Sequence, residues 1–232
     1  MPRNDSIKVL IVDDHLTFGE ALQVALSKER DLDVVDVVTD GEQAVEKVAE
    51  HRPDVVLMDL TMPGTDGIEA TRKIRSSEPE TRVVVLSGQE GELTFARAVQ
   101  AGASGFLPKT EGVVDVATAV RRVHRGELLH DDEEIEAALR RLRHRRQQEE
   151  SMERRLERLT PRETEILQLM AEGRSSQRIA ATLGMSPHTL RTHVQNILTK
   201  LGVHSKLEAL VAAIRYGRVS PESESETSEA TV

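Results

Sequence analysis

Five polar side chains in the first half of the chain each follow a short apolar run that is typical of a buried strand. They are Asp13, Asp14, Asp59, Ser87 and Lys109. Ligands of open α/β sheets bind beyond the carboxyl ends of the strands, so we expect these side chains to converge at one sheet edge. Three carboxylates in one crevice repel one another and require a cation. An all-oxygen set with few protein ligands is typical of a Mg²⁺ site.

The same set predicts phosphoryl chemistry at one carboxylate. A Mg²⁺ and the Lys109 ammonium on either side of Asp59 would stabilise the charge of a phosphoryl group that arrives at a carboxylate oxygen. The hydroxyl of Ser87 could then hydrogen-bond a phosphoryl oxygen. A single Asp at a strand end is more often a turn former or a helix cap. The five residues together favour an aspartyl phosphate site over that structural interpretation.

The elements that would position these residues alternate in type. Five β-rich runs are expected as strands, at 7–12, 33–38, 54–58, 82–86 and 104–108. Amphipathic stretches are expected as helices, at 16–29, 41–51, 67–77, 91–101 and 112–125. This alternation predicts a parallel five-stranded sheet with helices on both faces. The flavodoxin-like strand order 2-1-3-4-5 would bring the strand-end residues to one edge.

Charge divides the 232 residues into modules. Residues 1–139 hold 15 Lys and Arg against 28 Asp and Glu, a balance of −13, whereas residues 140–219 hold 16 against 8, a balance of +8. The stretch from Ser220 adds four Glu, and the net charge is −9. An acidic front and a basic back suggest two modules with different partners.

Composition also bounds the compartment. The chain has no cysteine, which excludes disulfides and thiolate metal sites. The N-terminus has no apolar signal core, and no run approaches the roughly 18 apolar residues that cross a bilayer. We therefore expect a soluble, cytoplasmic protein without a membrane partner.

A charged stretch without Gly or Pro joins the two modules. Between Asp131 and Leu159 the apolar residues form a broken seam, interrupted in the middle by charged side chains. This pattern predicts a helical linker, either a short and imperfect coiled coil or a solvated tether. The expected domains are 5–127 for the α/β domain, 128–157 for the linker, 158–217 for an all-α four-helix domain, and 218–232 for a disordered acidic tail.

The signals for the four C-terminal helices are helix caps. The starts are expected at the capping box Thr160–Glu163, at Ser175 or Ser176, at Ser186-Pro187, and at a second capping box, Ser205–Glu208. The ends are expected at Gly173, Gly184, Gly202 and Gly217.

The third of these helices has two separate stripes. The apolar stripe consists of Leu190, Val194, Ile197, Leu198 and Leu201, and the polar stripe of His188, Arg191, Thr192, Gln195 and Thr199. Together with the short helix before it, this helix is expected to form a helix-turn-helix. The third helix of the domain would then be the one that enters the major groove. Arg and Gln can read guanine and adenine, and a Thr methyl can contact thymine. Thr189, Lys200 and the helix N-terminus at Ser186 could hold phosphates. The alternative is a polar stripe that is only the hydrated side of the helix.

The motifs IVDDH, VVLMDLTMPGTDG, VVVLSG and GASGFLPK resemble the receiver domain of bacterial two-component response regulators, over roughly residues 5–127. The resemblance implies that a sensor histidine kinase phosphorylates Asp59. It also implies a Mg²⁺ shell from Asp13, Asp14, Asp59 and the carbonyl of Thr61. Ser87 and Lys109 would be the hydroxyl switch and the ion-pairing base. Phe106 would be the aromatic switch, where many relatives have Tyr, so no hydroxyl can report its inward state.

The segments LTPRETEILQLMAEG and IAATLGMSPHTLRTHVQNILTKLGV resemble the LuxR-type DNA-binding domain, over about 158–217. The whole chain is thus similar to response regulators of the NarL/FixJ type. The resemblance implies contacts of Arg191, Thr192 and Gln195 with bases of double-stranded DNA. It implies a homodimer through the fourth helix, with Leu207, Leu210, Val211 and Ile214. Ser176 and Gln195 depart from residues common in relatives, which leaves the operator sequence open.

The expected function is a DNA-binding transcription regulator, not an enzyme, in which phosphorylation shifts dimerisation and DNA affinity. Two alternatives stay open. A haloacid-dehalogenase-like phosphatase also uses a strand-end Asp, but it needs a second Asp at the position of Thr61. A constitutive DNA-binding protein could use the receiver only as a dimer platform.

Overall fold

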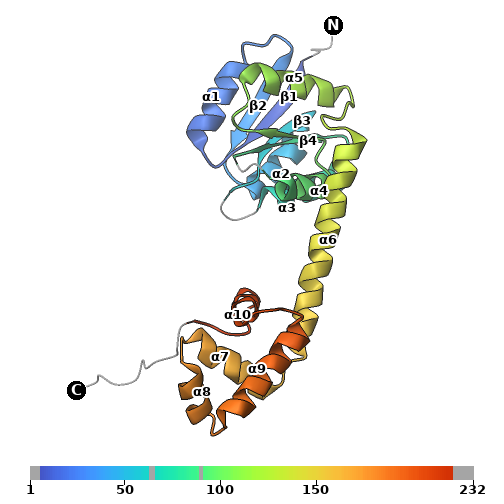
Figure 1. The fold of residues 1–232 in the computed structure, drawn as a ribbon. Helices are drawn as coiled ribbons and strands as arrows, with labels where there is room; N and C mark the ends of the chain where they lie inside the picture. Colours follow the sequence, from blue (N-terminus) through green and yellow to red (C-terminus); the bar gives the residue numbers. More distant parts are fainter. Residues whose placement is uncertain (1–5, 63–65, 89–90, 222–232) are drawn as a thin grey trace, which may run out of the picture. The chain divides into compact units, whose positions relative to one another are not determined.

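Five parallel strands form one sheet in the first of the two units into which the chain divides, Met1–His144 and Arg145–Val232. The computed structural model describes residues 6–62, 66–88 and 91–221. The strands are β1 (Ile7–Val12), β2 (Leu32–Val38), β3 (Val55–Asp59), β4 (Arg82–Ser87) and β5 (Gly105–Pro108). Their order, β2-β1-β3-β4-β5, and their parallel pairing confirm the predicted flavodoxin-like sheet (Figure 1).

Helices cover both faces of this sheet. They are α1 (Leu16–Leu26), α2 (Gly41–His51), α3 (Gly67–Ser77), α4 (Glu92–Ala101) and α5 (Val113–His124). In β1, Val9 and Ile11 pack with side chains of α1 and α5, whereas Leu10 and Val12 pack with side chains of α2 and α3. All four are at most 1% exposed. Burial on two faces explains why these strands are continuous apolar runs instead of alternating ones.

Several boundaries of these elements differ from the prediction, most of them by one residue. Helix α1 ends at Leu26, three residues early, where the Ser27 hydroxyl donates to the Gln23 carbonyl at 2.8 Å. Strands β3 and β4 each run one residue further than predicted, because Asp59 pairs with Leu86 and Ser87 pairs with Pro108 in the sheet register. The strand-end Asp and Ser are therefore fixed by the sheet itself.

The long helix α6 (Asp132–Glu157) contributes to both units, which divide between His144 and Arg145. In the first unit, Ala138 and Leu142 are buried against Ala96 of α4. In the second unit, Leu156 is 3% exposed and belongs to the core of the C-terminal helices. The apolar seam therefore packs inside each unit, which excludes a fully solvated tether. The coiled-coil alternative stays a prediction.

Four helices follow in the second unit: α7 (Pro161–Ala171), α8 (Ser176–Thr182), α9 (Pro187–Leu201) and α10 (Lys206–Arg215). The predicted capping box at Thr160 is confirmed. Ser175, not Ser176, is the N-cap of α8. The second capping box is only half formed, because the Glu208 carboxylate accepts from the backbone N–H of His204 instead of that of Ser205. Leu190, Val194, Ile197 and Leu201 are buried as predicted, and Leu198 is half-buried.

The packed part of the chain extends past the predicted limit at 217. Val219 is 6% exposed in the core of the second unit, and the backbone N–H and carbonyl of Ser220 both bond to the amide side chain of Gln168. The predicted acidic tail lies outside the described residues from 222 onward. None of the helices in the described ranges combines the length and the apolar character needed to cross a membrane.

Candidate functional site

The carboxyl ends of three strands bring two acids and a lysine together. Asp13 follows β1, Asp59 ends β3 and Lys109 follows β5. The Lys109 Nζ atom lies 2.6 Å from Asp13 Oδ2 and 2.9 Å from Asp59 Oδ2. Both Asp residues are 1% exposed. The convergence predicted from the sequence is thus present in the geometry.

The local backbone explains how these side chains are held. The backbone N–H of Lys109 donates to the carbonyl of Ser87 at 2.8 Å, and Ser87 is itself buried. The backbone N–H of Thr61, in the loop after β3, donates to Asp59 Oδ1 at 3.2 Å. Helix α3 begins against the same strand end, because a Cβ on Gly67 would lie 2.0 Å from the Asp59 carbonyl oxygen. Only glycine allows this close approach.

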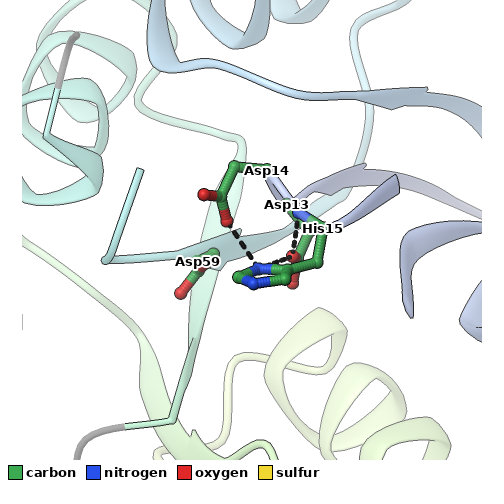
Figure 2. Close-up of side chains that lie close together, drawn as sticks. All are labelled: Asp13, Asp14, His15 and Asp59. Carbon is green, nitrogen blue, oxygen red and sulfur yellow. Dashed lines mark hydrogen bonds and ion pairs between the residues drawn. The ribbon is translucent and has the colours of Figure 1, made fainter. Parts of the chain in front are cut away.

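The acidic cluster contains one residue that the sequence interpretation left out. One possible ligand atom from each of Asp13, Asp14, His15 and Asp59 lies within 4.8 Å of the others (Figure 2). His15 donates its backbone N–H to Asp13 Oδ1 at 2.9 Å, and its Nδ1 lies 2.8 Å from Asp14 Oδ1. The available signal was its position directly after the acidic pair in IVDDH. Its imidazole is 72% exposed, so it lies at the rim of the cluster.

The donor set is consistent with a divalent metal site. Within the described ranges, Asp14 Oδ1 and Asp59 Oδ2 are buried and accept no hydrogen bond of normal geometry. Each has only an ion-pair contact, with His15 and Lys109 respectively. Carboxylate oxygens with free lone pairs are the ligands that hard divalent cations prefer. The residues present therefore fit such an ion.

The charges in the pocket shift one another's protonation. Burial raises the pKa of Asp59 above its ordinary value; Lys109 and the Thr61 N–H oppose this rise, and the Asp13 carboxylate adds to it. For Lys109, burial acts to lower the pKa, but the contacts with Asp13 and Asp59 outweigh it and the pKa is raised. Lys109 is thus a cation at neutral pH and partly offsets the two buried carboxylates. A second cation would oppose this rise in the pKa of Asp59, as Lys109 does.

Phe106, the predicted aromatic switch, points into the protein. It is 9% exposed, and its ring meets that of Phe95 edge to face, with centroids 5.8 Å apart. The Phe106 carbonyl lies 3.0 Å from His130 Nε2, and the side chain of Leu129 lies directly over Gly105. The residues that follow α5 therefore cover the outer side of β5. Sequence periodicity gives no signal for this contact.

Helix α9 presents most of its predicted DNA-reading side chains to solvent. His188, Thr189, Arg191, Thr192 and Gln195 are all exposed. The Thr189 N–H donates to the Ser186 hydroxyl, which caps the helix. Lys200 differs, because its Nζ lies 2.6 Å from Glu163 Oε2. This contact is an alternative to the predicted phosphate contact.

The predicted dimerisation residues form an apolar strip on α10. Leu207 is 69%, Val211 55% and Ile214 37% exposed, and Leu210 is half-buried. Large apolar side chains that recur on one helix face and remain exposed are typical of a surface that another chain covers.

Comparisons with known proteins agree with both halves. Residues 9–121 match the response regulator receiver domain, and residues 157–213 match the bacterial regulatory proteins of the luxR family. The chain is 36% identical over 214 residues to the response regulator protein VraR of Staphylococcus aureus. This match covers 92% of this chain and 99% of that protein. The crystal structure of ChrA, a response regulator of a heme-sensing two-component system, is 31% identical and has a TM-score of 0.51, with coverage of 92% and 99%. The signal receiver domain of NarL from Mycobacterium tuberculosis is 36% identical and has a TM-score of 0.52, covering 53% of this chain and 99% of that one.

Proposed function

Because this chain belongs to the LuxR-type family of DNA-binding response regulators, we propose that it is a transcription regulator controlled by phosphorylation of Asp59. A sensor histidine kinase would donate the phosphoryl group. The observation that carries the proposal is the contact of Lys109 with Asp13 and Asp59 at the carboxyl edge of the sheet. Buried charges stabilise a fold weakly, since desolvation offsets much of their attraction. A cluster of this kind is better explained by chemistry than by stability.

The proposed transfer makes one bond and breaks another. A carboxylate oxygen of Asp59 bonds to phosphorus while the bond from phosphorus to the donor breaks, and the donor keeps the electron pair. Asp59 must be ionised for this step. A Mg²⁺ held by Asp13, Asp14, Asp59 and the Thr61 carbonyl would supply charge that favours the ionised form and neutralises the phosphoryl oxygens. Lys109 and the hydroxyl of Ser87 would contact the phosphoryl oxygens of the product.

Acetyl phosphate and Mg²⁺ test this assignment without the kinase. The wild-type chain should gain one phosphoryl group, measured by intact mass, and Asp59→Asn should gain none. Asp54→Asn is the matched control, since Asp54 precedes β3 at its opposite end and should not affect the modification. Phosphorylation of Asp59→Asn would refute the assignment. Continuous turnover of small phosphate esters by the wild-type chain would instead favour the phosphatase alternative.

We further propose that α9 reads DNA in the major groove. Arg191, Thr192 and Gln195 would contact bases, and His188 lies on the same exposed side. Thr189 and the N-terminus of α9 at Ser186 would hold a phosphate. Lys200 is left out of this set because its ammonium contacts Glu163.

Salt and substitution test the DNA surface. Affinity for duplex DNA should fall linearly on a log–log plot against salt concentration. Arg191→Met should weaken specific binding by about 1–3 kcal/mol. Arg154→Met, which removes an exposed Arg of α6 in the same unit, should have little effect. A salt-independent affinity would count against the proposed surface.

Dimerisation would link the two halves. We propose that phosphorylation favours a dimer in which the strip of Leu207, Leu210, Val211 and Ile214 is covered, so that two α9 helices bind two half-sites. Val211→Glu should leave phosphorylation intact and abolish the phosphorylation-dependent gain in affinity. If affinity is the same with and without phosphate, the receiver is only a platform and this part of the proposal fails.

A further inference from the structure

The C-terminal end of α9 is held by an ion pair that starts inside the domain. Glu163, in the first turn of α7, is 3% exposed. Its Oε2 atom accepts from the Thr160 N–H at 2.7 Å and lies 3.0 Å from the Thr160 hydroxyl and 2.6 Å from Lys200 Nζ. The carboxylate thus joins the N-terminus of α7 to the last turn of α9.

A second cation holds the same end of α9. Arg155, in the last turns of α6, donates from Nη1 to the Leu201 carbonyl at 2.9 Å. Gly202 has φ +66, and a Cβ there would lie only 2.5 Å from Arg155 Nη1. Glycine therefore serves two purposes at this position, the left-handed turn that ends α9 and space for the guanidinium. The neighbouring Leu156 is buried in the core, which anchors Arg155.

Electrostatics favour both contacts. A buried carboxylate is unfavourable unless it is paired and hydrogen-bonded, and Glu163 has both kinds of partner. Cations at a helix C-terminus interact favourably with the carbonyl end of the helix dipole. Lys200 therefore has a strong partner within the domain, and a phosphate would have to compete with it.

The contacts of Lys200 with Glu163 and of Arg155 with the Leu201 carbonyl together form an anchor at the C-terminal end of α9. The position of this anchor matters for the other end of the helix. The predicted base-reading residues lie at the N-terminal part of α9, and His188 is twelve residues, or about 18 Å, from Lys200. A tilt of about 5° at the anchored end would move the reading end by about 1.5 Å over this length. Hydrogen bonds to base edges do not tolerate such a shift.

We propose that Lys200 is a positioning residue for DNA reading. It acts through Glu163 to fix the direction of α9, together with Arg155, and does not neutralise a DNA phosphate. This inference rests on the proposed role of α9 as the DNA-reading helix.

The test compares Lys200→Met, Lys200→Arg, Glu163→Gln and the double variant Glu163→Gln/Lys200→Met in the phosphorylated full chain. The probe is a duplex that the wild-type chain selects from a random-sequence pool, and affinity is measured over a range of salt concentrations. Gln at the third helical position keeps a capping box, so the double variant is a neutral pair in place of the charged one.

We expect Lys200→Met to weaken specific binding by about 5- to 100-fold, which corresponds to one misplaced base contact, with an unchanged salt slope. Lys200→Arg should restore most of the affinity, because Arg keeps a cation beside Glu163. The double variant should bind no worse than Lys200→Met alone, because both changes interrupt the same contact. A slope reduced by about 0.9 in Lys200→Met would show that this lysine neutralises a phosphate and would overturn the proposal. Additive losses in the double variant would overturn it as well.

Hydrogen exchange of the DNA-free chain separates this inference from the proposed function. If the anchor exists, Lys200→Met and Glu163→Gln should both speed exchange of the last-turn amides of α9, and Lys200→Arg should not. Unchanged exchange in both variants would refute the anchor. If the anchor holds but the wild-type chain binds no duplex, the proposed DNA reading fails, and with it the positioning role of Lys200.

Discussion

Replacing Lys109 by Met should destabilise the first unit by about 3–5 kcal/mol at neutral pH, because the change leaves two buried carboxylates without their cation. The ammonium lies 2.6 Å from Asp13 and 2.9 Å from Asp59, both at most 2% exposed. The Lys109 Nζ atom also lies over the ring of Phe18, 5.1 Å from its centroid. Met keeps much of the volume of the lysine stem. The loss would therefore come mainly from charge.

A double-mutant cycle with Asp59→Asn measures how much of this loss is charge. In the wild-type background, Asp59→Asn leaves Lys109 paired with Asp13. In the Lys109→Met background, it removes one of two unpaired carboxylates and should recover about half of the loss. We expect a coupling energy of about 2 kcal/mol, within the range for residues of one charge network.

The loss should also depend on pH. Burial already raises the pKa of Asp59, and removal of Lys109 removes an interaction that lowers it. The folded state then holds a proton at a pH where the unfolded state, with a pKa near 3.8, has lost it. Stability must therefore fall as pH rises from about 3.8 through the raised folded pKa, and Lys109→Met should be least harmful in acid.

Hydrogen exchange of the β3 amides in the full chain is the suitable assay, because it reports opening of the first unit alone, whereas bulk denaturation of two units is not two-state. Lys47→Met is the control, since Lys47 forms a surface pair with Glu50, and little change is expected. A loss below about 1 kcal/mol, or single changes that add within about 0.5 kcal/mol, would refute the charge argument.

Three other predictions concern packing and acid. Gly67→Ala should destabilise the first unit by about 3 kcal/mol or more and slow phosphorylation, because its Cβ would overlap the carbonyl at the end of β3; Gly88→Ala meets no atom within 4 Å and should be nearly neutral. Hydrogen exchange of the β3 amides and acetyl phosphate labelling would measure the two effects. Burial acts to raise the pKa of Glu163, but the Lys200 contact and hydrogen bonds outweigh it, so the pKa is lowered. The second unit should therefore lose stability as pH falls below about 4.5, and Glu163→Gln should remove that part of the acid dependence, measured by hydrogen exchange of the α9 amides. Phe106→Ala should destabilise the first unit by about 3 kcal/mol, because it leaves a cavity beside Phe95. Hydrogen exchange of the β4 amides would measure this loss, and a loss under about 1 kcal/mol would mean that the ring is not packed inward in solution.

The sheet and the pocket could be predicted because their signals are local. Four of the five strands are short runs rich in β-branched residues, and β5 is the short run GFLP. Each functional residue comes at or directly after a strand end, so the parallel arrangement alone brings Asp13, Asp59 and Lys109 together. The errors at strand ends were one residue long, because periodicity does not show whether the polar residue itself joins the ladder. Asp59 and Ser87 do so through pairing with a neighbouring strand.

Long-range partners could not be predicted in the same way. Lys200 lies on a polar flank of α9, where its charge suits a phosphate as well as a carboxylate. Its partner Glu163 looked like an ordinary capping residue 37 positions earlier. The choice between two partners depends on burial, which a single helix pattern does not contain. The same holds for His130, whose bond to the Phe106 carbonyl joins segments 24 residues apart.

The cover over β5 also bears on solubility. The strand order leaves β2 and β5 as the two edges of the sheet, and an uncovered edge offers unpaired backbone groups to the strands of other molecules. On β5 the Leu129 side chain lies so close to Gly105 that a Cβ there would meet it at 2.3 Å, and His130 occupies the next carbonyl. A side chain at position 105 would displace Leu129 from β5. The edge strand would then be exposed and prone to aggregation.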